Sequence, residues 1–160
     1  MTPERVYIRT IYIWNGLALF TRNSYGTYIK PTEGISEQAY RTIMKRLGEG
    51  GYWIWIATSK STDIIKEKKS YIIGAVWISG IVETERYKKE YNHKRVMDHF
   101  VESKDCKYQM VIPMNENARR ELKEPIRMHE YERGENREGG VWRAREGASI
   151  YEGLQNAEYA

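Results

Sequence analysis

The chain of 160 residues has few of the side chains on which several classes of protein depend. Its single cysteine, Cys106, excludes a disulfide framework and a metal site built from several cysteines. Among its three histidines, His93 and His99 are six residues apart, so they lie on different faces of a predicted helix and give little support to a zinc site. A membrane-spanning helix needs about 20 consecutive apolar residues, and no apolar run in the sequence approaches that length. No membrane partner is therefore expected.

Motifs for nucleotide binding and for nucleophilic hydrolysis are also missing. The sequence has no Gly-x-x-x-x-Gly-Lys-Ser/Thr loop, no Gly-x-Gly-x-x-Gly loop after a strand and no Gly-x-Ser-x-Gly elbow. The first residues, Met1 to Arg5, lack the cationic leader, apolar core and cleavage site of a secretory signal. We therefore expect an intracellular, cytoplasmic protein.

The composition is that of a folded chain with an uneven distribution of charge. Hydrophobic residues make up 41% and charged residues 30%, which predicts one globular domain and not a disordered chain. The net charge is +4, but residues 113–160 hold eight basic and ten acidic residues, which leaves +6 for residues 1–112. A basic body suits phosphate backbones, so nucleic acid is the expected partner, DNA more than RNA.

The first part of the chain predicts a hairpin followed by a helix. Residues 6–21 are rich in β-branched and aromatic types on both sides of Asn15-Gly16, a dipeptide typical of tight hairpin turns. A short third strand is expected to end at Pro31. Ser36 is suited to cap a helix over residues 37–47, whose apolar residues recur at helical spacing.

Strands and helices alternate through the rest of the chain. Residues 52–57 are apolar or aromatic at every position, as in a central strand, and residues 71–83 form the longest β run. A helix is predicted over residues 92–101, a strand over residues 106–112 and a third helix over residues 116–124.

This order of elements predicts an α+β fold. We expect a mainly antiparallel sheet of five to six strands with two to three helices packed on one side of it. Residues 1–125 form the body, and residues 126–160 form an arm rich in Glu and Arg that is part of the same domain or flexible. Trp142 and Tyr151 are the residues through which such an arm can pack.

An acidic and basic segment follows the longest β run. Strand alternation places Glu83 and Glu85 on one face, where two carboxylates can hold Mg²⁺ or Mn²⁺ and so activate a water for attack on phosphorus. Arg86 and Lys88 can then engage the phosphate. The alternative is that the strand simply leaves the core and enters a solvated linker.

Aromatic and basic residues alternate in the predicted strands. Trp53, Trp55 and Trp77 can provide a platform on which unpaired bases stack, or they can belong to the core. Basic residues interleave with aromatic ones in the N-terminal part, and they are the candidate phosphate contacts: Arg5, Arg9, Arg22 and Lys30.

The chain is also unusual in the side chains it prefers within each chemical type. It has 19 Glu to 3 Asp, 17 Ile, and 13 Tyr to 2 Phe, a bias that suits proteins of high-temperature organisms. In this respect it resembles the small proteins encoded by viruses of hyperthermophilic archaea. The resemblance implies a nucleic-acid binder, a nuclease, a virion component or an inhibitor of host defence.

Taken together, the residues favour a nucleic-acid-directed protein, with metal-dependent phosphodiester cleavage at Glu83 and Glu85 as the preferred mechanism. One alternative is a non-catalytic interaction or assembly protein, which pairs into a homo-oligomer through a strand edge or the C-terminal arm. A second alternative is a nucleic-acid-binding module that stacks bases on its tryptophans.

Overall fold

The computed structural model describes residues 7–11, 13–60, 69–90, 106–128, 141–144 and 149–160. Its elements in chain order are β1 (Tyr7–Ile11), α1 (Ile13–Phe20), β2 (Thr32–Ile35), α2 (Glu37–Arg46), β3 (Tyr52–Lys60), β4 (Lys69–Ile78), β5 (Gly80–Glu83), α3 (Thr84–Glu90), β6 (Tyr108–Val111), the 3-10 helix η1 (Glu116–Ala118), β7 (Arg119–Met128), β8 (Val141–Arg143) and α5 (Ser149–Gln155).

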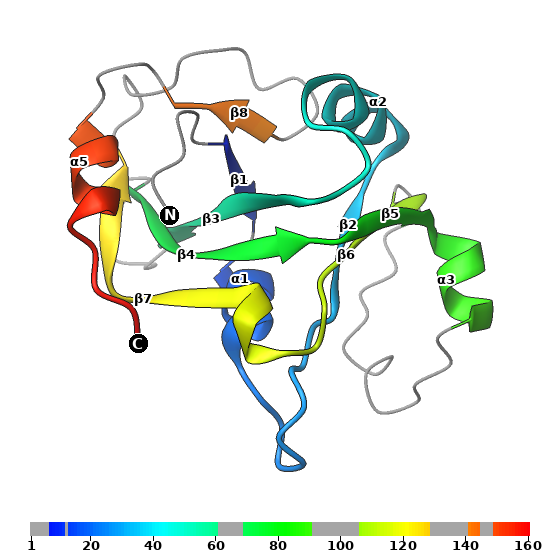
Figure 1. Cartoon of the computed structure of the whole chain (residues 1–160), viewed down its shortest axis with the longest axis horizontal. Coiled ribbons are helices and arrows are strands. Elements are labelled where there is room, and N and C mark those ends of the chain that lie inside the picture. The colour runs from blue at the N-terminus through cyan, green and yellow to red at the C-terminus, as the bar shows by residue number, and fades with distance from the viewer. Residues whose placement is uncertain (1–6, 12, 61–68, 91–105, 129–140, 145–148) are drawn as a thin grey trace.

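The strands form two sheets, which Figure 1 shows side by side. One sheet has five strands in the order β7-β4-β3-β1-β8, and the other has three in the order β2-β6-β5. Strands β1 and β3 are parallel, and the remaining pairs among the described strands are antiparallel. The α+β class and the mainly antiparallel pairing are therefore confirmed, with the strands divided between two sheets instead of gathered in one.

Strand β3 lies in the middle of the five-stranded sheet, as its apolar sequence predicts. Ile54 and Ile56 belong to the core on one face of the sheet, while Trp55 and Ala57 belong to the core on the other face. Each face of the sheet therefore carries a hydrophobic core.

The two cores are closed by different elements. The first core takes in side chains from α1, α2 and the three-stranded sheet, among them Leu19, Ile43 and Met110. The second core is closed by α5, whose Ile150 and Leu154 are buried. The prediction that the helices pack on one side is therefore wrong, because α5 covers the face opposite to α1 and α2.

Helix α2 confirms the prediction for residues 37–47. The Ser36 side chain accepts a hydrogen bond from the Ala39 backbone N–H (3.1 Å), and Ala39 and Ile43 are buried on the inner face. The chain leaves the helix through Gly48, whose φ of +86° suits a residue without a side chain.

The hairpin predicted over residues 6–21 is wrong, because only its first part is a strand and Asn15-Gly16 lies inside α1. A Cβ on Gly16 would lie 2.5 Å from Thr58 Cγ2, so the glycine lets the helix approach β3 closely instead of making a turn. The strand expected to end at Pro31 is also wrong: Arg22 and Tyr28 form an isolated bridge, and β2 begins after the proline.

The helix predicted over residues 116–124 is replaced by η1 and β7. β7 lies at the edge of the five-stranded sheet, where Pro125 is tolerated because an edge strand does not need every backbone N–H for pairing. Its Leu122 is buried in the second core and Ile126 packs against the same core, so tertiary packing overrides the helix-forming residues around them.

Three other predictions meet different outcomes. The run over residues 71–83 is divided at Ser79 into β4 and β5, which join different sheets. The helix predicted over residues 92–101 lies outside the described residues. In the segment 126–160, β8 pairs with β1, and α5 packs on the sheet.

Candidate functional site

The two acidic residues predicted to bind metal lie where β5 passes into α3. Glu83 ends the strand and Glu85 stands in the first turn of the helix, so strand alternation no longer relates them. Both are exposed, and Glu85 Oε1 lies 3.4 Å from Lys88 Nζ. In the described parts of the chain, no group of three or more His, Cys, Asp or Glu residues is placed to hold a metal ion. Binding of Mg²⁺ or Mn²⁺ by the pair stays a prediction.

The basic residues that follow this pair extend along α3. Arg86 Nε lies 2.9 Å from Glu90 Oε1, and Lys88 faces Glu85 one turn back. Such pairs at a spacing of three or four residues are ordinary on a solvated helix surface. In this arrangement the cations neutralise neighbouring carboxylates, so phosphate has to compete with them.

Glu83 has an aromatic neighbour. It is paired in register with Tyr108 of β6, whose ring stacks on that of Tyr40 with 3.8 Å between centroids. Partial burial, followed by the effects of Tyr40, Glu37 and Glu83, raises the pKa of the Tyr108 phenol. The Tyr108 phenol beside Glu83 thus has aromatic, acidic and basic neighbours, since Arg41 acts on its pKa in the opposite direction.

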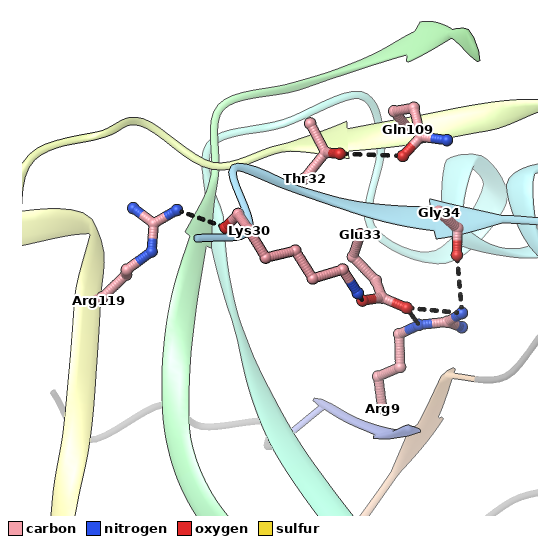
Figure 2. A network of polar contacts seen from close by, with 7 residues as sticks. All are labelled: Arg9, Lys30, Thr32, Glu33, Gly34, Gln109 and Arg119. Atoms are coloured by element: carbon pink, nitrogen blue, oxygen red, sulfur yellow. Dashed lines mark hydrogen bonds and ion pairs between the residues drawn. The ribbon is translucent and has the colours of Figure 1, made fainter. Parts of the chain in front are cut away.

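Two of the candidate phosphate contacts belong to a buried ionic network, which Figure 2 shows between the two sheets. Arg9 Nε lies 3.4 Å from Glu33 Oε1, and Arg9 Nη2 donates to the Gly34 carbonyl (3.2 Å). Lys30 Nζ binds the other oxygen of Glu33. The Arg9 and Lys30 side chains are only 13% exposed and that of Glu33 7%, so this network joins β1 to β2 instead of facing a ligand. Arg5 lies outside the described residues.

Arg22 is exposed, unlike the cations of that network. Its guanidinium lies 2.7 Å from Glu116 Oε1 and donates to the Tyr28 hydroxyl (3.2 Å). These hydrogen bonds, first with Tyr28 and then with Glu116, raise the pKa of Arg22.

Arg119 is a buried cation that sequence reasoning missed because it placed this residue in a helix. Its guanidinium lies 4.1 Å from the centre of the Tyr28 ring and donates to the carbonyls of Leu19 (2.8 Å), Lys30 (3.0 Å) and Pro113. Figure 2 shows the bond to Lys30. Burial lowers the pKa of Arg119 to about 10. No local pattern marks such a residue, since Leu19 and Lys30 are about 90 to 100 residues away in the sequence and only Pro113 is nearby.

The three tryptophans of the predicted platform have different environments. Trp55 is buried in the second core with only 1% of it exposed, because α5 covers that part of the sheet. The prediction that Trp55 stacks on bases is therefore wrong. Trp53 and Trp77 are partly exposed and pack edge to face, with 5.6 Å between ring centroids. Two of the three rings therefore remain accessible.

An exposed arginine and a tyrosine complete this region. Arg120 of β7 places its guanidinium 5.1 Å from the centre of the Trp53 ring and 5.7 Å from that of Tyr159. We call Trp53, Trp77, Arg120 and Tyr159 the aromatic–arginine surface. The sequence identified the tryptophans, but Arg120 was missed because residues 116–124 were expected to be a helix, and Tyr159 was missed because its pairing with β7 joins distant parts of the chain.

The C-terminal residues position Tyr159 by pairing with β7. Tyr159 forms a bridge with Leu122, the Lys123 N–H donates to the Glu158 carbonyl (2.8 Å), and the Ala160 N–H donates to the carbonyl of Glu121 (2.9 Å). The tyrosine is therefore held by backbone hydrogen bonds next to Arg120.

Comparison of the chain with protein-family models, with curated proteins and with solved structures gives no match. Among the described residues, no helix has the length and apolar character needed to cross a membrane.

Proposed function

We propose that this protein binds nucleic acid and that unpaired bases stack on the aromatic–arginine surface. The observation that carries the proposal is the position of the Arg120 guanidinium over Trp53 and beside Tyr159 on exposed sheet surface. Any base can stack on an aromatic ring face, and each stacked base contributes about 1–3 kcal/mol to binding. A guanidinium adds a further stacking surface and attraction to phosphate.

Single strands are the form that such a surface favours. The faces of the bases are stacked on one another inside a base-paired duplex, so protein side chains cannot reach them. The bases of an unpaired strand are accessible. The positive net charge of +4, and the excess of +6 in residues 1–112, support electrostatic attraction to the phosphates. We propose DNA as the first substrate to test and RNA as the second.

Cleavage of the bound strand is a further part of the proposal. Glu83 and Glu85 are exposed carboxylates at adjacent ends of β5 and α3, and together they would hold Mg²⁺ or Mn²⁺ if Glu85 releases Lys88. Arg86 and Lys88 would then engage phosphate. Cleavage is proposed because carboxylate oxygens are suitable ligands for these ions, and the protein can bind nucleic acid without cleaving it.

The test of binding is fluorescence anisotropy of labelled single-stranded DNA, single-stranded RNA and duplex DNA. We expect Trp53→Ala and Arg120→Ala each to weaken single-strand binding by about tenfold, as the loss of one stacking contact implies. Arg41→Ala is the matched control, because Arg41 is an exposed arginine paired with Glu37 on α2. Equal affinity of all four proteins, or no binding by the wild type, contradicts the proposal.

The test of cleavage uses the same oligonucleotides with Mg²⁺, Mn²⁺ or EDTA. Products that form only with metal and disappear in Glu83→Ala and Glu85→Ala support it. Intact substrate under all conditions leaves a non-catalytic binding protein, and a stable oligomer that does not bind nucleic acid favours the assembly alternative.

A further inference from the structure

The segment that joins α1 to β2 extends away from the body, as the blue-to-cyan loop in Figure 1 shows. We call residues 21–30 the finger. Its two sides are held together by the bridge of Arg22 with Tyr28 and by a hydrogen bond from the Ile29 N–H to the Thr21 carbonyl (2.9 Å). The finger is thus internally hydrogen-bonded.

The tip of the finger holds one aromatic side chain in solvent. The Asn23 side-chain oxygen accepts from the backbone N–H groups of Tyr25 (2.9 Å) and Thr27 (3.1 Å), and Gly26 takes a φ of +80°. Tyr25 is 68% exposed, the highest value among the exposed large apolar and aromatic residues in the described part of the chain. A fixed turn therefore presents an accessible ring.

The base of the finger is tied to the strand that carries the aromatic–arginine surface. Arg119 and Arg120 are consecutive in β7, so their side chains point to opposite faces. Arg119 stacks on Tyr28 at the base of the finger, while Arg120 lies over Trp53. The finger and the surface are therefore anchored at the same end of β7 but on opposite faces of the sheet, so a strand that contacts both has to pass around this edge of the sheet.

We infer that the finger is a second nucleic-acid contact, in which Tyr25 stacks on a base of the same strand that the aromatic–arginine surface binds. The inference rests on the proposed function. An exposed tyrosine offers a ring face of the kind that bases stack on.

Charge at the finger predicts what kind of contact it makes. Arg22 is paired with Glu116 at 2.7 Å, so its attraction to phosphate is largely neutralised. The contact of Tyr25 is therefore expected to depend little on salt. Releasing Arg22 from Glu116 should add one phosphate contact and so increase both the affinity and its salt dependence.

The experiment measures binding of single-stranded DNA to two Tyr25 variants and to Glu116→Gln across a range of salt concentrations. Tyr25→Ala should weaken binding about fivefold to tenfold at every salt concentration, while Tyr25→Phe, which keeps the ring, should stay within about twofold of the wild type. Glu116→Gln should bind more tightly at low salt, with a salt slope steeper by roughly 0.7. Thermal unfolding checks that all variants fold.

The outcomes separate this inference from the proposed function. If Trp53→Ala weakens binding but Tyr25→Ala does not, the finger inference fails and the proposed function stands. If the wild type does not bind, both fail. If sedimentation shows that Tyr25→Ala dissociates an oligomer while binding is unchanged, the finger is a contact between copies of the chain, which overturns the inference.

Discussion

Arg119 joins the start of β7 to the distant segment 19–30 and to the nearby Pro113 through one side chain. Only 6% of the residue is exposed, and its guanidinium donates hydrogen bonds to the carbonyls of Leu19, Lys30 and Pro113. In Arg119→Ala these carbonyls lose their donor, and each buried polar group left without a partner costs about 1–3 kcal/mol. We predict that the free energy of unfolding, measured by chemical denaturation, falls by roughly 3 kcal/mol or more.

Arg120→Ala is the control for this prediction, because it removes the neighbouring, exposed arginine from the same strand. Its free energy of unfolding should change by less than about 1 kcal/mol. A similar small loss in Arg119→Ala would contradict the role assigned to Arg119.

Single residues also show the limit of sequence reasoning about the site. Trp53 and Trp55 have the same local pattern in β3, yet the first is partly exposed and the second is buried. The difference arises because Ile150 and Leu154 of α5 cover one end of that face. Periodicity assigns side chains to a face, but it cannot say which part of the face a distant helix covers.

At the scale of elements, alanine substitutions at two helical glycines are expected to change the free energy of unfolding in opposite directions. Replacing glycine by alanine in a helix gains about 1 kcal/mol from propensity alone. At Gly16 the new Cβ would lie 2.5 Å from Thr58 Cγ2 and 3.1 Å from Ile73 Cδ1, whereas at Gly153 its nearest neighbour is Ile126 at 3.5 Å.

We therefore expect Gly16→Ala to lower the free energy of unfolding by about 1–3 kcal/mol, because overpacking pushes α1 away from β3. Gly153→Ala should raise it by about 0.5–1 kcal/mol. Denaturant titration of both variants measures the signs, and stabilisation by Gly16→Ala would show that α1 does not pack closely on β3.

The elements that sequence analysis predicted correctly are those whose local signals agree. The Ser36 cap, the apolar spacing and Gly48 all indicate α2, and the structure has this helix. Strand β7 was missed because its charged sequence favours a helix, while burial of Leu122 against α5 decides the outcome. The Asn15-Gly16 signal failed for a similar reason, since close packing on β3 requires the glycine in a helix.

At the scale of the whole molecule, one carboxylate links the two sheets. Glu33 of β2 pairs with Arg9 of β1 and with Lys30, and all three side chains are largely buried. Removing the carboxylate leaves two buried cations without a neutralising negative charge, which lowers the free energy of unfolding by about 3–5 kcal/mol. We predict that Glu33→Gln lowers the free energy of unfolding by this amount.

Glu37→Gln is the matched control, since Glu37 is an exposed carboxylate that pairs with Arg41 at 3.1 Å. Its effect should lie between 0 and about 1 kcal/mol, as for other surface ion pairs. Equal effects of the two variants, measured by the same denaturation, would contradict the structural role of Glu33.

The charge asymmetry of the sequence takes a different meaning once the fold is known. The basic excess of residues 1–112 predicts a phosphate-binding surface, but Arg9 and Lys30 are buried with Glu33 and Arg22 is paired with Glu116. The exposed arginine of the aromatic–arginine surface comes instead from β7, in the acidic last third of the chain. Net charge by segment could not locate this surface, because the fold brings segments together.

Quenching of tryptophan fluorescence by single-stranded DNA tests the central claim most directly. If bases stack on Trp53, titration quenches the emission of the wild type, and Trp53→Phe loses most of that quenching while the buried Trp55 still emits. Equal quenching in the wild type and in Trp53→Phe, or no quenching at saturating DNA, would contradict base stacking on the aromatic–arginine surface.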